Sequence, residues 1–162
     1  MTTSSDLAET AVSVVLEVNG ERHQLTVHPR RTLADLLRHD LGLVGTQVGC
    51  EQGTCGTCTV LVDGEPARSC LIFAVQVDGE RVETVESLAA GGELSALQRV
   101  FSELHAVQCG FCTPGFLVLA TALLRNEPRA DRQRIRAELS ANLCRCTGYA
   151  GIVDAVESLT RS

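Results

Sequence analysis

The polar and apolar residues of this chain follow two different periods. Two β-rich segments, residues 12–18 and 22–27, are separated by Asn19-Gly20, a residue pair preferred in tight hairpin turns. Beyond Gly92 the apolar residues instead recur at helical spacing, at Leu94, Leu97, Phe101 and Leu104. The pattern predicts strands in the first half of the chain and helices in the second.

The rest of the first half predicts a short helix, a loop and further strands. The helix lies in "TLADLLRHDLG", where Thr32 is the expected N-cap, Asp35 follows three residues on, and Gly42 ends the helix. A glycine-rich loop then covers residues 45–58. It is followed by "TVLVDG" and "AVQVDGERVETV", which predict strands broken by Asp-Gly turns.

The second half predicts a group of packed helices. The composition changes at "AAGG", residues 89–92, which we take as the domain junction. A helix opened by "TPGF", with Thr113 as N-cap and Pro114 at its first position, is apolar nearly all round and should be central. A charged helix in "ADRQRIRAELSA" and a last one from about Gly151 complete the set. We therefore expect an α+β protein with a flexible N-terminus (1–11), a strand-rich domain (12–88) and a helical domain (89–162).

Composition adds eight cysteines to this picture. A chain of 162 residues with 44% hydrophobic content forms one globular unit or two small ones, and cores of that size are marginal alone. The N-terminal sequence "MTTSSDLAETA" has neither the basic region nor the apolar region of a secretory signal, so we expect a cytoplasmic location with reduced thiols. Cysteines there are more often metal ligands than disulfides.

Charge and hydropathy argue against two classes of partner. The net charge is -6 with acidic and basic residues interspersed, which speaks against nucleic acid or an anionic membrane surface. The longest apolar run, residues 116–124, is about half the length needed to cross a bilayer. We expect no nucleic-acid binding and no membrane insertion.

The first four cysteines have the spacing of a plant-type 2Fe-2S ferredoxin. Cys50-x4-Cys55-x2-Cys58 is followed, after eleven residues, by Cys70. The loop is rich in glycines that permit positive φ and close backbone approach, so that N–H groups can point at an anionic cluster. A zinc loop is the alternative, although structural zinc usually takes two CxxC-like pairs and only Cys55 and Cys58 form one. The glycines are Gly45, Gly49, Gly53 and Gly56.

The last four cysteines form two close pairs, and their spacing leaves two metals open. Cys109-x2-Cys112 is separated by a predicted helical hairpin from Cys144-x1-Cys146, which by itself suits a structural zinc. Both pairs precede a predicted helix, and two helix N-termini would favour any anionic, thiolate-ligated centre. That argument serves a zinc ion with four thiolates as well as a 2Fe-2S cluster.

Together these segments resemble a known family. "GCEQGTCGTCTVLVDGE", the "SC" at Ser69-Cys70, "QCGFCTPG" and "NLCRCTGY" are similar to the iron-sulfur subunit or domain of the molybdenum hydroxylases. That family includes xanthine dehydrogenase, aldehyde oxidoreductase, bacterial N-heterocycle hydroxylases and the aerobic carbon monoxide dehydrogenase. All eight cysteines match it in order and spacing, over about residues 12–159.

The resemblance implies a fold and two metal sites. An N-terminal β-grasp 2Fe-2S ferredoxin-like domain would be followed by a C-terminal four-helix bundle 2Fe-2S domain. One cluster would be bound by Cys50, Cys55, Cys58 and Cys70, and the other by Cys109, Cys112, Cys144 and Cys146.

The resemblance also implies an electron-transfer role in an oxidoreductase. Electrons would leave a molybdenum-pterin centre in a large subunit, reach the helical-domain cluster, pass to the ferredoxin-like cluster, and continue to FAD on a medium subunit. The whole complex is expected to be a dimer of heterotrimers. This chain would have no substrate-converting site of its own, since it has no GxGxxG after a strand, no GxxxxGK and no nucleophile motif.

Two residues are implied to lie beside the pterin, Gln108 and Cys146. Gln108 has an alternative role, because a glutamine before a buried loop can simply satisfy backbone groups. Cys146 is a cluster ligand on either account.

Two other classes of protein compete with this interpretation. A free-standing double-cluster ferredoxin would need no helical half and no "QCGFCTPG". A zinc-stabilised interaction protein would be colourless. Within the family, the loop "CEQGTCGTC" favours a complex acting on an N-heterocycle or an aldehyde over carbon monoxide, although specificity belongs to the molybdenum subunit.

Overall fold

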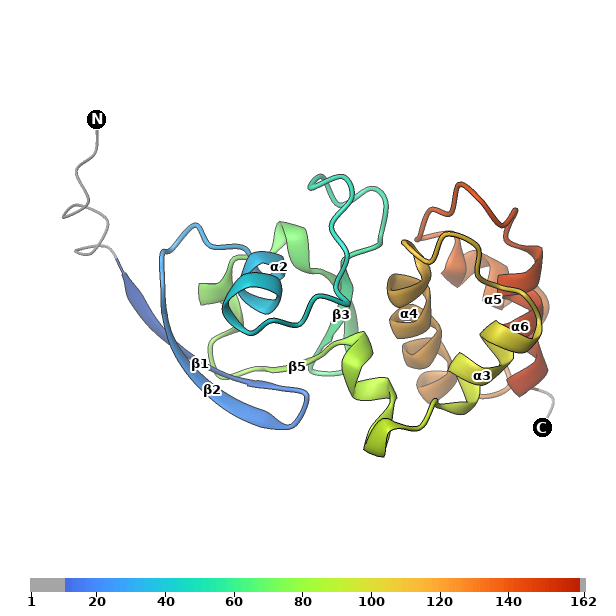
Figure 1. Ribbon diagram of the computed structural model, residues 1–162, viewed down its shortest axis with the longest axis horizontal. Coiled ribbons are helices and arrows are strands. Elements are labelled where there is room, and N and C mark those ends of the chain that lie inside the picture. The colour runs from blue at the N-terminus through green and yellow to red at the C-terminus, as the bar shows by residue number, and fades with distance from the viewer. Residues whose placement is uncertain (1–10, 161–162) are drawn as a thin grey trace.

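The computed structural model describes residues 11–160, which form a mixed α+β fold with a sheet half and a helical half (Figure 1). The predicted flexible N-terminus, residues 1–11, lies outside the described residues except for its last position. The strands are β1 (Val12–Val18), β2 (Glu21–Val27), β3 (Thr59–Val62), β4 (Glu65–Arg68) and β5 (Arg81–Glu83). The α-helices are α2 (Leu33–Asp35), α3 (Ala96–Glu103), α4 (Thr113–Asn126), α5 (Arg132–Leu139) and α6 (Ala150–Thr160). Shorter helical turns are η1 (Leu36–Asp40), η2 (Ser69–Leu71), η3 (Ala74–Val77), η4 (Val85–Leu88) and η5 (Ala90–Gly92).

The five strands form one sheet in the order β2-β1-β5-β3-β4. β1 and β2 pair antiparallel, and β5 runs parallel to β1. The β1–β2 turn has φ of 53° at Asn19 and 86° at Gly20, and positive φ at both central residues is what a type I′ hairpin requires. The predicted hairpin is confirmed, with β2 starting one residue earlier than expected.

The core of the sheet half follows the alternation of β1. From Val14 onward every second residue of this strand is buried, which is the period of a strand with one face on a core. These residues pack against the helical segment that begins at α2. The residues of β1 are Val14, Leu16 and Val18, and those of the helical segment are Leu33, Leu36 and Leu37.

The start of this helical segment is also as predicted. Thr32 is the N-cap of α2, and its Oγ1 accepts a hydrogen bond from the N–H of Asp35 at 3.1 Å. The segment continues as one wider π-helical turn, η1, and the chain then turns away at Gly42, whose φ is 72°.

Two segments of the sheet half differ from the prediction. Ala74–Val77, expected as a strand, forms the 3₁₀ turn η3, because its two buried residues lie three positions apart and not two. The strand β4 was not predicted. It contains Pro66, which weakens the strand signal but is tolerated here because β4 is an edge strand.

In the helical half, α3 to α6 pack around one hydrophobic core. Phe101 of α3, Phe116 of α4, Ile135 of α5 and Val156 of α6 are at most 1% exposed within it. α3 starts with a reciprocal capping box in which Ser95 and Gln98 each accept a hydrogen bond from the other's backbone N–H.

The apolar helix α4 is central, as its composition predicted. Its Val118 and Ala122 pack on Leu61 of β3, while other residues of α4 belong to the helical core. Its predicted N-cap was wrong by one residue: the helix already includes Thr113, and Cys112 takes the N-cap position without a side-chain capping bond. Thr113 can take a helical position because its N–H already has an acceptor, the carbonyl of Gly110 at 3.2 Å.

The segment between the two halves packs against both of them. Val85 and Leu88 of η4 contact the helical core and also the small cluster around Leu61. The domain boundary at residue 89 therefore stays a prediction. Between residues 11 and 160, no helix is both long enough and apolar enough to cross a membrane.

Two positions on β1 test the sheet core. Leu16→Ala removes a side chain that is 1% exposed, so it should lower the free energy of unfolding by about 2–5 kcal/mol. Val12→Ala on the same strand changes a residue that is 42% exposed and should cost less than about 0.5 kcal/mol. Urea denaturation of both variants measures the difference, and equal losses would contradict this description of the core.

Candidate metal centres

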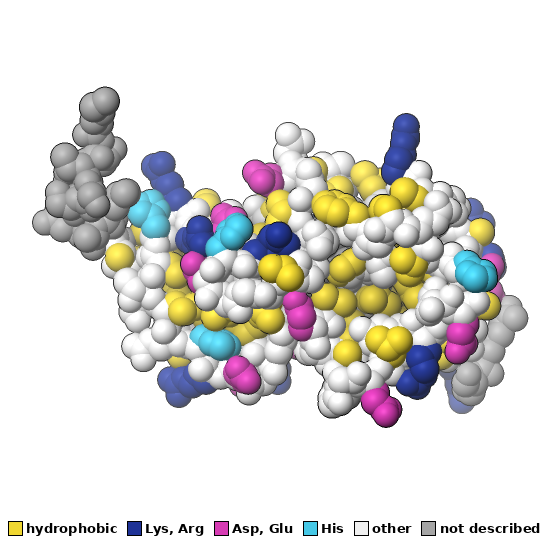
Figure 2. Space-filling model, viewed as in Figure 1, with side chains coloured by type: hydrophobic (Ala, Val, Ile, Leu, Met, Phe, Trp, Pro, Cys, Tyr) yellow, Lys and Arg dark blue, Asp and Glu magenta, His cyan; other side chains and the backbone are white. Residues whose placement is uncertain are grey.

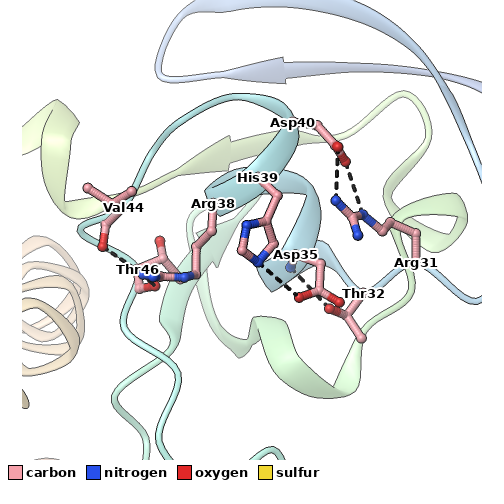
Figure 3. Close-up of polar contacts among 8 residues, drawn as sticks. All are labelled: Arg31, Thr32, Asp35, Arg38, His39, Asp40, Val44 and Thr46. Atoms are coloured by element: carbon pink, nitrogen blue, oxygen red, sulfur yellow. Dashed lines mark hydrogen bonds and ion pairs between the residues drawn. The ribbon is translucent and has the colours of Figure 1, made fainter.

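The loop that leads to the first cysteines is fixed by an arginine and a glutamate. Figure 3 shows Arg38 pointing toward Val44 and Thr46, and its Nη1 donates to their carbonyl oxygens at 2.8 and 2.9 Å. Glu86 of η4 accepts a hydrogen bond from the N–H of Gly45 at 2.8 Å. Three successive loop residues are thus held by side chains of opposite charge from two different elements.

The first four cysteines approach each other as two pairs. The side chains of Cys50 and Cys55 lie within hydrogen-bonding reach of each other, and so do those of Cys58 and Cys70. The Cys50 sulfur accepts from the backbone N–H groups of Gln52 and Cys55, both at 3.4 Å. The loop therefore directs backbone dipoles at a sulfur, as predicted for a site that holds negative charge.

The glycines of this loop divide into two kinds. Gly53 and Gly56 have positive φ, of 74° and 76°, as predicted. Gly45 and Gly49 do not have positive φ. They show the other predicted property, close approach: a Cβ on Gly45 would lie 2.5 Å from Val85, and one on Gly49 would lie 3.3 Å from the Cys55 sulfur.

The environment shifts the thiol pKa values in opposite directions across the first site. Backbone N–H groups of Cys55 and then Gln52 stabilise the thiolate of Cys50 and lower its pKa to about 7. Burial raises the pKa of Cys70 to about 11, and the adjacent Cys58 thiol raises it further. One side of the site is supplied with hydrogen-bond donors, and the other side is enclosed.

The last four cysteines also form two pairs, one outside and one inside. Cys109 and Cys146 are exposed, with their sulfurs 3.6 Å apart. Cys112 is buried and its side chain lies within hydrogen-bonding reach of Cys144. Although they are 32 or more positions apart in sequence, the two segments are brought together by the packing of α4, α5 and α6.

Thr147 and Tyr149, which follow Cys144 in the sequence, determine the surroundings of its side chain and backbone. The N–H and Oγ1 of Thr147 both donate to the Cys144 sulfur, at 3.4 and 3.1 Å. Burial alone would raise the pKa of Cys144, but these donors outweigh it and lower the pKa. Tyr149 accepts the backbone N–H of Cys144 through its hydroxyl at 2.9 Å and packs its ring edge-on to Phe116.

Two other thiols of this second site, Cys112 and Cys146, have raised pKa values. Burial raises the pKa of Cys112 to about 12, and Cys144 adds to the effect. The Cys109 thiol raises the pKa of Cys146. A neighbouring thiol thus disfavours ionisation of Cys112 and of Cys146, and a bound cation would relieve this effect.

The paired arrangement bears on which metal group the cysteines fit. Among the described residues, no three or more histidine, cysteine or acidic side chains converge closely enough to hold a single metal ion. A mononuclear zinc needs four ligands around one point. A 2Fe-2S cluster has two irons, so four thiols in two facing pairs suit it, and all eight cysteines are free of disulfides.

The two cysteine sites touch each other through backbone. The N–H of Leu143 donates to the carbonyl of Cys55 at 2.8 Å. A Cβ on Gly56 would lie 1.9 Å from Asn142 Oδ1, and one on Gly115 would lie 2.5 Å from the Gly56 carbonyl. We call this contact, made by Cys55, Gly56, Gly115, Asn142 and Leu143, the inter-loop joint.

Several residues of the joint were not singled out from the sequence. Asn142 is 1% exposed and precedes the cysteines of "NLCRC", which was the available signal. Arg68 bridges the two halves by donating to Thr59 Oγ1 and to the carbonyl of Ala141. Gln108 is exposed and directly precedes Cys109, and its predicted place beside the pterin stays a prediction.

The surface around the exposed cysteine pair is apolar. On the face shown in Figure 2, hydrophobic side chains gather over the helical half. Val107, Phe111 and Leu143, which flank the second site in sequence, are 38%, 45% and 50% exposed. Such a concentration of apolar residues near exposed cysteines is typical of a surface that another protein covers.

Comparison with known proteins gives two family matches on this chain. Residues 16–95 match the 2Fe-2S iron-sulfur cluster binding domain, and residues 84–157 match the [2Fe-2S] binding domain. Each match contains one of the two sets of four cysteines.

Individual relatives cover nearly the whole chain. The 6-hydroxypseudooxynicotine dehydrogenase complex subunit beta of Paenarthrobacter nicotinovorans is 55% identical, over 90% of this chain and 91% of that protein. The xanthine dehydrogenase iron-sulfur-binding subunit of Escherichia coli O157:H7 is 44% identical, over 90% and 92%. In the crystal structure of quinoline 2-oxidoreductase from Pseudomonas putida 86, one chain superposes with a TM-score of 0.90 at 48% identity, over 93% of each chain.

Two adjacent 2Fe-2S binding domains make this chain an iron-sulfur electron-transfer protein, and the component of an oxidoreductase. More specifically, the chain belongs to the family of iron-sulfur small subunits of the molybdenum hydroxylases, the xanthine dehydrogenase family.

Two glycines with similar backbone conformation test the inter-loop joint. Replacing Gly56 or Gly64 by alanine should lower the free energy of unfolding by about 1 kcal/mol, since both have φ above 70°, in the left-handed region that disfavours a Cβ. Only at Gly56 does the new Cβ meet other atoms, which adds about 1–3 kcal/mol of overpacking. We expect a lower melting temperature and reduced visible absorption for Gly56→Ala than for Gly64→Ala, and equal values would contradict the close approach.

Proposed function

We propose that this chain carries electrons between two partner subunits of a molybdenum hydroxylase. A large subunit would hold the molybdenum-pterin centre and a medium subunit would hold FAD. Within the chain, residues 12–88 would be a β-grasp ferredoxin-like domain and residues 89–162 a four-helix bundle domain. The first would bind its cluster through Cys50, Cys55, Cys58 and Cys70, and the second through Cys109, Cys112, Cys144 and Cys146.

The hydrogen bond from Leu143 N–H to the Cys55 carbonyl is the observation that carries this proposal. Cys55 is a proposed ligand of the first site, and Leu143 directly precedes Cys144 of the second. The two sets of thiols are therefore linked through one hydrogen bond and a short length of backbone. Two independent structural metal sites would not require such a link.

The chemistry of the bound groups is one-electron transfer, since each 2Fe-2S cluster takes up and releases single electrons. The chain's own residues stabilise the charge that this involves. Gln52 and Cys55 donate backbone N–H bonds to Cys50, and Thr147 donates two bonds to Cys144. Hydrogen bonds to sulfur favour the thiolate and are among the factors that set a cluster's reduction potential.

The exposed end of the second site is the proposed entry point for electrons. Cys109 and Cys146 are exposed, and Gln108 beside them makes no hydrogen bond within the described residues that would hold it to backbone. This favours a contact of Gln108 and Cys146 with the pterin over the alternative role of Gln108 in satisfying local backbone. The apolar surface of Val107, Phe111 and Leu143 would then lie under the large subunit.

We place this complex in the cytoplasm as a dimer of heterotrimers. All eight cysteines are free of disulfides, which fits a reducing compartment. The net charge of -6 supports protein partners over nucleic acid, and the chain would neither enter a membrane nor convert substrate itself.

An N-heterocycle is the substrate class we propose for the whole complex. The relatives described above are named for 6-hydroxypseudooxynicotine, xanthine and quinoline, and all three names denote molecules with nitrogen-containing rings. An aldehyde is the second candidate, because an aldehyde oxidoreductase from Megalodesulfovibrio gigas is 41% identical over 90% of this chain. Dye reduction by the purified native complex, assayed with N-heterocycles, aldehydes and carbon monoxide, distinguishes these classes.

Metal content tests the electron-transfer role directly. The purified chain should be coloured and should contain iron and acid-labile sulfide in equal amounts, since each cluster has two of each. A colourless preparation that contains zinc would favour the zinc-stabilised interaction protein instead. A coloured chain that purifies without partner subunits, and that reduces acceptors alone, would favour the free-standing ferredoxin.

Removing a ligand of the second site should stop turnover of the complex. Cys109→Ser or Cys144→Ser should lose about half of the iron and block reduction of the flavin by substrate, because this site lies between the pterin and the first site. Rapid mixing with substrate under anaerobic conditions measures flavin reduction. A normal rate in either variant would show that the proposed electron path is wrong.

A further inference from the structure

Arg68 reaches from the sheet half to the helical half at the inter-loop joint. It is the last residue of β4 and lies two positions before Cys70. Its Nη1 donates to Thr59 Oγ1 on the neighbouring strand β3. Its Nη2 donates to the carbonyl of Ala141 at 2.6 Å, 73 positions away in sequence. One half-buried guanidinium thus spans two loops that each carry proposed cluster ligands.

The two acceptors of Arg68 lie next to the joint, one on either side. Thr59 Oγ1 donates in turn to the Gly56 carbonyl at 2.6 Å, which fixes the turn next to Cys55. Ala141 is directly followed by Asn142 and Leu143, so its carbonyl sets the position of the segment whose N–H reaches Cys55. Removing the guanidinium would release both sides of the joint at once.

The local electrostatics suit a cation at this point. Ala141 and Asn142 continue the C-terminal turn of α5, since their N–H groups donate to the carbonyls of Glu138 and Leu139 at 3.1 Å. The C-terminal end of a helix carries partial negative charge, which a guanidinium stabilises. A planar guanidinium also presents donors in fixed directions, so it can satisfy two acceptors that a lysine ammonium reaches one at a time.

We propose that Arg68 is a positioning residue for electron transfer between the two 2Fe-2S sites. By holding residues 141–143 against the Gly56 turn, it keeps the hydrogen bond between Leu143 N–H and the Cys55 carbonyl formed, and so fixes the separation of the two sets of thiols. This inference rests on the proposed function, because the separation matters only if electrons cross it.

Another arginine in the chain serves as the matched control. Arg125 of α4 also joins the two halves, through two hydrogen bonds of 2.9 Å to Glu83 of β5. It lies thirteen residues beyond Cys112 along α4, about 20 Å at 1.5 Å per residue. Arg125→Met therefore loosens the contact between the halves at a distance from the second site and outside the inter-loop joint.

Magnetic coupling between the clusters reports their separation independently of enzyme activity. When both clusters are reduced, each has an unpaired spin, and the splitting of their electron paramagnetic resonance signals falls steeply with distance. In the full chain carrying both clusters, Arg68→Met should retain its iron and the individual signals but lose the resolved splitting. Electron transfer between the clusters should slow, because its rate also falls steeply with their separation. Arg125→Met should retain both the splitting and the rate.

A conservative variant keeps the test decisive if Arg68→Met does not load its clusters. Arg68→Lys keeps the charge but reaches only one acceptor at a time, so its splitting should be weakened while its iron content is normal. Normal splitting in Arg68→Met or Arg68→Lys would overturn the proposal, and so would an equal loss in Arg125→Met. A wild-type chain without iron would instead contradict the proposed function, before any variant is compared.

Discussion

The backbone of Gly56 lies directly against Gly115 of α4 and against the side chain of Asn142, and the rest of the structure is arranged around this close approach. Atoms as near as those around Gly56 and Gly115 leave no room for a Cβ at either position. Backbone contacts of this kind fix two loops more closely than side-chain packing, which can slide or repack. The fold can therefore be described as two small cores held in one relative position by a joint between their cysteine loops.

The surroundings of the sulfurs follow from the same arrangement. Each site has a sulfur that receives several donors, Cys50 in the first and Cys144 in the second. Each also has an enclosed thiol, Cys58 or Cys112. An anionic group with donors on one side and low-dielectric protein on another is stabilised unevenly, and that unevenness tunes its electronic properties.

Local sequence patterns predicted the turns, caps and helices that depend on neighbouring residues alone. The Asn19-Gly20 hairpin, the Thr32 cap and the central helix α4 each follow from a few neighbouring residues. Ala74–Val77 was mistaken for a strand because the core residues that decide which of its side chains are buried lie elsewhere in the sequence. The bridges across the halves join residues far apart in sequence: Arg68 contacts Ala141, 73 positions away, and Thr59 contacts Asn142, 83 positions away. Cys109 and Cys146 are 37 positions apart, so no local period predicts any of these contacts. The sequence predicted both positive φ and close backbone approach for the loop glycines. Gly45 and Gly49 show only the second, because side chains distant in sequence, such as Val85 and Phe111, lie against them.

The contact of Leu61 with Val118 and Ala122 has a consequence for the modularity of the chain. Leu61 is 1% exposed only because α4 covers that face of the sheet. Cut apart from the helices, the sheet half would present bare apolar surface beside an edge strand, a combination that promotes aggregation. The helical half thus supplies the layer that covers one face of the sheet. Gene fusion or exchange in this family should therefore move both halves as one unit and not as two interchangeable parts.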